Sequence, residues 1–242
     1  MHVERHGDPQ GPRVLLLHGG GVAGWMWKPL REHLGPRRRL LIPDLPGHDR
    51  SAQQPYISHD ETVSGLVSIL EADGAAPTAV VGFSLGAQLA VLLAAERPDL
   101  VDRVVVISAQ AQPTPAPRLT LALLRSASGL ARVRWFARLQ AKELFIPPAL
   151  LDDYLRTSAA MTSQSLVAAV GENIRFAVPD AWRSFPGQAL ILAGSHEKAL
   201  MRASADALHD ALPGSSLHVV ADAGHGIPLQ RPSLVARELE QL

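Results

Sequence analysis

Short, continuous apolar runs recur along the chain, and most are separated from the next by a longer segment with helical spacing. A run of this kind, bounded by turn residues, is typical of a strand that is buried on both faces of a sheet. The pattern therefore predicts an α/β fold in which helices cover both faces of a mostly parallel sheet. The predicted strands are residues 14–17, 40–42, 78–81, 104–107, 189–192 and 217–220.

Helical spacing is clear between most of these runs, but the region 111–187 breaks the alternation. Prolines mark the exit from the sheet and the return to it, and helical patterns without a clear buried strand fill the interval. We expect a core of residues 1–110 and 188–242, with residues 111–187 inserted as a helical cap over the strand ends. The helices predicted in the core are residues 27–34, 61–72, 87–97, 201–212 and 232–242.

Composition narrows the class of protein. The length of 242 residues and the 47% hydrophobic content fit a packed globule of one large α/β domain or two small ones. Basic and acidic residues balance at 23 each, so no net field favours nucleic acid or an anionic membrane as partner.

The absence of cysteine excludes disulfides and a thiolate nucleophile. With no apolar signal segment and no run of about 20 apolar residues, the chain is predicted to be cytoplasmic.

The stretch Gly82-Phe83-Ser84-Leu85-Gly86 follows a predicted strand and precedes a predicted helix. This G-x-S-x-G pattern is typical of a nucleophile elbow, a sharp turn that leaves the serine hydroxyl exposed. Both glycines are expected because a Cβ there would strike the neighbouring strand or helix. The alternative is that Ser84 merely caps the helix. We predict that Ser84 is a nucleophile.

A glycine run after the first predicted strand supplies candidate oxyanion donors. In acyl transfer, backbone N–H groups aimed at the developing negative oxygen are usually the largest single contribution to the rate. The predicted donors are the N–H groups of Gly20 and of Leu85, which directly follows the serine.

The same glycine run permits another interpretation. Gly19, Gly21 and Gly24 spell G-x-G-x-x-G after a strand, and Asp44 lies where a dinucleotide fold keeps its ribose-binding acid. Against a nicotinamide enzyme, bulky residues at 25–27 occupy the position where a helix must start beside pyrophosphate. This alternative also leaves Ser84 without a role.

His225 follows the last predicted strand, in a loop suited to a general base. A neutral imidazole can take the serine proton near pH 7 and return it to the leaving group. The acid that orients the imidazole is predicted to be Glu197, after the strand 189–192, with Asp222 as the alternative. A salt bridge of Glu197 with Lys198 or Arg202 is the structural alternative. No histidine follows His196-Glu197 at zinc-motif spacing, so no metal is expected.

Together these motifs resemble the α/β-hydrolase superfamily over nearly the whole chain outside the cap. The resemblance implies a triad of Ser84, His225 and an acid, an oxyanion hole at Gly20 and Leu85, a helical cap, and no cofactor. The motifs that carry it are His18 to Gly21, Asp44 to His48 with Ser51, Gly82 to Gly86, Gly194 to Glu197, and Gly224-His225 with Pro232.

Two positions depart from the usual pattern of that superfamily. Asp49 stands where a glycine normally ends the Pro-Gly-His-Gly turn, and we expect the turn to survive because aspartate tolerates left-handed backbone angles. The triad acid is glutamate rather than the commoner aspartate.

The predicted activity is hydrolysis of a small-molecule carboxylic ester through an acyl-enzyme. The alternative from another class is a ligand sensor that keeps the fold without the chemistry. Substrate contacts are predicted from Trp25, Phe83, Trp135 and Phe136, and the remaining aromatic and methionine candidates of the cap are Phe145, Tyr154, Met161 and Phe176.

A stretch of the cap carries basic residues and no acidic ones. It is either a solvated helix face or a surface that favours an anionic substrate or an acidic carrier. The pattern makes no prediction of the oligomeric state. The basic residues are Arg118, Arg125, Arg132, Arg134, Arg138 and Lys142.

Overall fold

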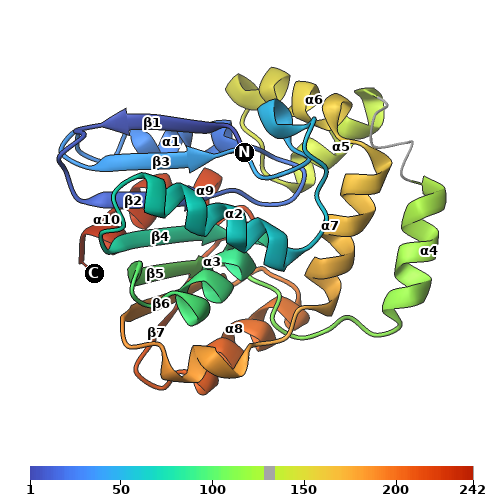
Figure 1. Cartoon of the computed structure of the whole chain (residues 1–242). Coiled ribbons are helices and arrows are strands. Elements are labelled where there is room, and N and C mark those ends of the chain that lie inside the picture. Colours follow the sequence, from blue (N-terminus) through green and yellow to red (C-terminus); the bar gives the residue numbers. More distant parts are fainter. Residues whose placement is uncertain (128–133, 242) are drawn as a thin grey trace.

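Seven strands form one sheet in the computed structural model, which describes residues 1–127 and 134–241 (Figure 1). The strand order is β1-β3-β2-β4-β5-β6-β7, and only β1 runs antiparallel to its neighbour. The predicted α/β class with a mostly parallel sheet is therefore confirmed. The strands are β1 Val3–Gly7, β2 Arg13–Leu17, β3 Arg39–Pro43, β4 Thr78–Phe83, β5 Val101–Ile107, β6 Gln188–Gly194 and β7 Ser216–Val220.

Helices cover both faces of the sheet, and the side chains of β5 show why its sequence is continuously apolar. Val104 and Val106 pack into the core beneath α2, α3 and α8, whereas Val105 and Ile107 pack on the opposite side, against α1, α9 and α10. Successive side chains of a strand point to opposite faces, so both sets must be hydrophobic. These helices are α1 Lys28–Arg31, α2 His59–Ala72, α3 Leu85–Glu96, α8 Ala199–Ala211, α9 Ile227–Gln230 and α10 Pro232–Gln241.

The first strand is the element that the hydrophobic pattern misses. β1 lies at the edge of the sheet and pairs with β3 from Val3 opposite Pro43 to Gly7 opposite Arg39. None of its residues is fully buried, and Glu4, Arg5 and His6 leave no apolar run, because an edge strand keeps one side in water.

The predicted helix 27–34 is also shorter than expected. A 3-10 turn, η1 Gly24–Trp27, leads into α1, which ends at Arg31. None of the helices in the described ranges has the length and apolar character required to cross a membrane.

The chain between β5 and β6 forms the helices predicted for residues 111–187, and no strand is found in its described part, 108–127 and 134–187. In Figure 1 these helices lie beyond the carboxyl ends of the parallel strands. An ion-pair cluster ties α6 to the core: Arg156 binds Asp49 at 3.1 Å, and Lys28 binds Asp153 at 2.7 Å. The segments are α4 Pro117–Ala127, α5 Arg134–Glu143, η4 Pro148–Leu150, α6 Leu151–Ala160, α7 Ser163–Arg175 and η5 Asp180–Ser184.

Candidate active site

Ser84 occupies the turn between β4 and α3, and its backbone is in an unusual conformation. Its φ of 53° and ψ of −112° lie in a region that residues other than glycine rarely adopt. Its N–H donates to the carbonyl of Ile107 on the neighbouring strand, at 2.9 Å. The hydroxyl makes no capping hydrogen bond to α3, so the alternative that Ser84 serves only as a helix cap does not describe this turn.

The two glycines of the motif allow strand and helix to approach closely. A Cβ on Gly82 would lie 2.3 Å from the carbonyl oxygen of Gly86, and one on Gly86 would lie 2.3 Å from the carbonyl oxygen of Leu17. Both distances are far below van der Waals contact, and both neighbours are backbone atoms. Glycine is therefore required at both positions if Ser84 is to keep its conformation.

His225 and Glu197 complete a chain of hydrogen bonds from Ser84. The Nδ1 of His225 lies 2.7 Å from Glu197 Oε1, and its Nε2 lies 3.1 Å from Ser84 Oγ. A carboxylate can only accept, so Nδ1 carries the ring proton and Nε2 is left to accept the serine hydroxyl. The ring of Phe83 supports the imidazole at a centroid distance of 5.2 Å.

Glu197 is oriented by its own loop. Its second carboxylate oxygen accepts the N–H of Gly194 at 2.9 Å, and its side chain is almost fully buried. The alternative acid, Asp222, is 83% exposed at its side chain and lies 3.9 Å from His196. The carboxylate of Glu197 has no salt bridge to Lys198 or Arg202, since Arg202 binds the Glu197 carbonyl instead. The geometry thus places Glu197, and not Asp222, beside the imidazole.

The predicted oxyanion donors lie next to the serine. Gly20 and Leu85 line the same cavity as Ser84. Within the described ranges, no hydrogen bond engages the N–H of either residue. The two donors are therefore available to a negatively charged oxygen at the serine.

Two buried histidines hold the glycine loop in place. His18 Nε2 accepts the N–H of Leu45 at 2.8 Å, and its Nδ1–H donates to the carbonyl of Gly19 at 2.8 Å. His48 Nε2 accepts the N–H of Gly21 at 3.2 Å, and its Nδ1–H donates to Pro46 at 2.8 Å. Both rings use one nitrogen as acceptor, so the neutral form is required. Burial accordingly lowers the pKa of His18 to about 4 and that of His48 to about 3.

Asp44 has a structural role that the dinucleotide interpretation did not foresee. Its side chain is fully buried, with one oxygen accepting the N–H of Gly24 at 2.9 Å and the other accepting Arg50 Nε at 2.8 Å. One oxygen holds Gly24 of the glycine loop and the other holds Arg50, so both buried oxygens are already engaged within the protein. The motif formed by Gly19, Gly21 and Gly24 is therefore not a dinucleotide site.

Asp49 keeps the turn that the sequence put in question, with a left-handed φ of 38°. Its carboxylate is the group that binds Arg156 of α6.

Within the described residues, no group of three or more His, Asp or Glu side chains is arranged to hold a metal ion.

A cavity of about 610 Å³ opens above Ser84, and we call it the Ser84 cavity. The glycine loop and the elbow form its floor, and helices of the insertion form most of its walls. The lining residues are Gly20, Gly21, His48, Ser84, Leu85, Leu124, Gln140, Leu144, Tyr154, Ser158, Met161, Ser163, Leu166, Ala169, Val170, Asn173 and Lys198.

Of the four residues singled out as substrate contacts, Trp25, Phe83 and Trp135 do not line this cavity. Trp25 is 5% exposed: it packs in the apolar core, and its indole N–H donates to Thr157 on α6 at 2.9 Å. Phe83 is buried under Gly19 and His225. Trp135 is 64% exposed on α5, and the side chain of Phe136 lies outside the described residues.

The other cap candidates divide in two. Tyr154 and Met161 do line the cavity, as the sequence suggested. Phe145 instead covers the loop that carries His225: a Cβ on Gly224 would lie 2.8 Å from the Phe145 ring. Phe176 packs on His59, with 6.0 Å between the centroids of the two rings.

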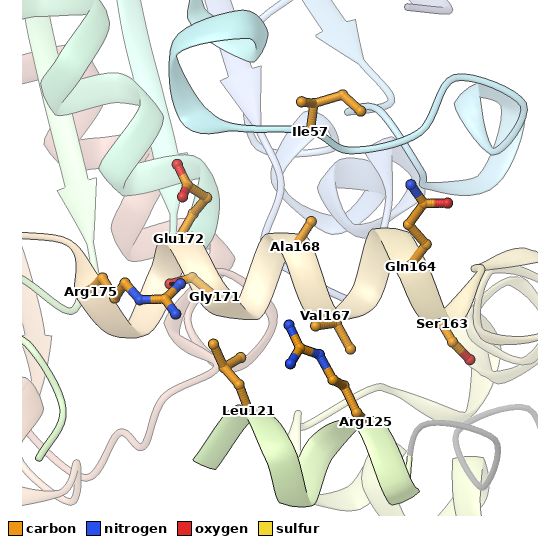
Figure 2. Close-up of a pocket in the computed structure, with 10 residues that line it drawn as sticks. All are labelled: Ile57, Leu121, Arg125, Ser163, Gln164, Val167, Ala168, Gly171, Glu172 and Arg175. Carbon is orange, nitrogen blue, oxygen red and sulfur yellow. Dashed lines mark hydrogen bonds between the residues drawn. The ribbon is translucent and has the colours of Figure 1, made fainter. Parts of the chain in front are cut away.

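A second hollow, of about 530 Å³, lies between α4 and α7 (Figure 2). Figure 2 shows the guanidinium group of Arg125 in this gap, whereas that of Arg175 lies along α7, where it donates to the carbonyl of Gly171 at 3.2 Å. Four of the basic residues predicted for the cap surface are described by the structure. All four are exposed, and none lines the Ser84 cavity: Arg118, Arg125, Arg138 and Lys142. Arg132 and the side chain of Arg134 lie outside the described residues. Among the described lining residues, the charge of the Ser84 cavity thus comes from Lys198, which the sequence pattern did not indicate as a cavity residue.

Comparison with known proteins gives a consistent match. A family model described as the alpha/beta hydrolase family matches residues 14–238. The chain is 43% identical to lipase LipV of Mycobacterium tuberculosis over 108 residues, which are 44% of this chain and 41% of that lipase. It is 29% identical to a putative carbamate hydrolase RutD of a Caulobacter strain over 96% of this chain and 91% of the relative.

Solved structures show the same fold at lower identity. The enol-lactonase of Burkholderia xenovorans superposes with a TM-score of 0.84 at 20% identity, covering 99% of this chain and 94% of the lactonase. At this identity the likeness shows the fold alone.

The close approach at the elbow predicts a loss of stability on adding a single methyl group. We expect Gly82→Ala to lower the free energy of unfolding by about 3 kcal/mol, since the Cβ would meet backbone that cannot rotate away. Gly214→Ala is the matched control, because nothing lies within 4 Å of a Cβ at that exposed turn. Urea denaturation measures both variants, and equal stabilities would contradict the account.

The buried histidines predict a dependence of stability on pH. Their folded pKa values lie below the unfolded value of about 6.5. Their contribution is therefore complete above pH 6.5 and declines as the pH falls toward 4, by up to about 1.4 kcal/mol per pH unit for each ring.

Urea denaturation between pH 7.5 and 5 measures this slope. We expect His48→Gln to reduce the slope, and the exposed His33→Gln to leave it unchanged. A slope unaltered by His48→Gln would contradict the assignment of a buried, neutral ring.

Proposed function

The chain belongs to the alpha/beta hydrolase family of enzymes, and we propose that it is a serine hydrolase that cleaves small-molecule carboxylic esters through an acyl-enzyme. The observation that carries the proposal is the continuous hydrogen-bonded line from Glu197 through His225 to Ser84, at 2.7 and 3.1 Å. A nucleophile, a base and an orienting acid in this order are the machinery of covalent acyl transfer.

In the first step, Ser84 Oγ attacks the ester carbonyl while His225 Nε2 takes its proton. The carbonyl oxygen becomes negative and accepts the N–H groups of Gly20 and Leu85. Glu197 keeps the proton on Nδ1 and stabilises the imidazolium that forms. When the tetrahedral intermediate collapses, His225 gives the proton to the departing alcohol, and the acyl group remains on Ser84.

In the second step, water takes the place of the alcohol. His225 removes one of its protons, the resulting hydroxide attacks the acyl carbonyl, and the same two N–H groups hold the oxyanion. The carboxylic acid leaves as Ser84 recovers its proton from His225. The reaction consumes one water and requires no redox partner.

We assign residues 111–187 the role of a cap that shapes the substrate site. This segment supplies most of the cavity wall, including Leu124 on α4, Leu144 just after α5, Met161 just after α6 and Leu166 on α7. These side chains are apolar, which suits a substrate with a hydrocarbon portion. The names of the relatives, a lipase and a putative carbamate hydrolase, agree with hydrolysis at a carbonyl carbon.

Replacement of the nucleophile tests the proposal. We expect Ser84→Ala to lower kcat for p-nitrophenyl butyrate by at least about 10⁴-fold, because no other group can form the acyl-enzyme. Ser64→Ala, an exposed serine on α2, should retain the wild-type rate. Circular dichroism establishes that the variants are folded. Turnover by folded Ser84→Ala at the wild-type rate would reject the serine mechanism, and absence of turnover by the wild type on every ester tried would favour a binding protein.

The identity of the acid is tested by two amide substitutions. Glu197→Gln should lower kcat by about 10²-fold or more, since an amide does not stabilise the imidazolium and can impose the wrong tautomer. Asp222→Asn removes the same charge from an exposed side chain and should leave kcat within twofold of the wild type. If the two variants exchanged these outcomes, Asp222 would be the triad acid.

A further inference from the structure

Lys198 is the one charged side chain among the described residues that line the Ser84 cavity. The other polar lining groups are neutral: serine hydroxyls, the amides of Gln140 and Asn173, and the buried imidazole of His48. No carboxylate of the described lining faces into the cavity. The cavity thus combines apolar walls with a single positive charge.

The backbone of Lys198 is fixed relative to the reacting groups. It directly follows Glu197, whose two carboxylate oxygens are held by His225 and by the N–H of Gly194. It is also the N-cap residue of α8, with φ −59° and ψ 151°. The ammonium group therefore extends from a backbone that the triad and a helix both hold in place.

Lys198 is an exposed residue, and its ammonium group makes no ion pair or hydrogen bond with any residue that the structure describes. The cations of the neighbouring ion-pair cluster differ, since Lys28 binds Asp153 and Arg156 binds both Asp153 and Asp49. An ammonium without a counter-ion in a partly enclosed, otherwise neutral cavity favours a ligand that brings a negative charge.

We propose that the substrate is an ester that also carries a free carboxylate, and that Lys198 binds this carboxylate while Ser84 attacks the ester. This proposal rests on the serine mechanism above. The ester carbonyl lies at the N–H groups of Gly20 and Leu85, and the carboxylate lies at Lys198 Nζ. The intervening methylenes then lie along the apolar wall. The spacing between Ser84 and Lys198 accordingly selects a length of chain between the two groups.

A series of matched esters tests this specificity. The probes are monoethyl esters of linear dicarboxylic acids from four to eight carbons, each compared with the ethyl ester of the monocarboxylic acid of equal length. Hydrolysis is followed by pH-stat titration. We expect kcat/KM to favour the monoethyl ester of the dicarboxylic acid over its neutral counterpart by about tenfold at one chain length, the size of a hydrogen bond to a charged group. Added salt should reduce the preference.

Two lysine variants complete the test. Lys198→Gln should lower the ratio of kcat/KM for the charged and neutral esters by about tenfold, and Lys198→Glu should lower it further. Lys142→Gln, which removes the same charge from an exposed position on α5, should leave the ratio unchanged. A wild-type ratio near one at every length, or a ratio that Lys198→Gln does not alter, would overturn the inference. The serine mechanism would stand in that case, because Ser84→Ala tests it separately.

Discussion

The strained backbone of Ser84 is the constraint on which the rest of the site depends. A positive φ at a residue with a side chain is stable only where its surroundings enforce it. Here the start of α3 approaches β4 and the end of β2 so closely that Gly82 and Gly86 have no room for a Cβ. This approach projects the hydroxyl from the carboxyl end of the sheet, where the loops after β2, β6 and β7 bring the other groups of the site.

The loop that carries Gly20 is held by polar groups rather than by apolar packing. His18, His48 and Asp44 each receive a backbone N–H of this loop or of the turn that supports it. Buried polar groups are costly unless they are paired, so the three side chains allow few other arrangements of the loop. The same bonds require both imidazoles to be neutral, which links the shape of the oxyanion site to pH.

The sheet and the three aligned side chains were predictable because each depends on local sequence. Ser84, Glu197 and His225 lie in the turns that follow β4, β6 and β7, and parallel strands bring such positions to one edge. β1 was missed because an edge strand carries no continuous apolar run. The cavity walls were not predictable, since the packing of the insertion decides which side chains face Ser84. Trp25 shows this: its ring is buried in the core, and its indole N–H donates to Thr157, 132 residues away in sequence. Lys198 was adjacent to a predicted residue, but nothing in the sequence shows that it faces the cavity.

The central claim is that Ser84 is an activated nucleophile because His225 and Glu197 are aligned behind it. Reaction of the native protein with a fluorophosphonate, followed by peptide mass spectrometry, tests this claim most directly. The account predicts stoichiometric modification of Ser84 and of no other serine. A folded protein that remains unmodified, or one modified at a different serine, would contradict it.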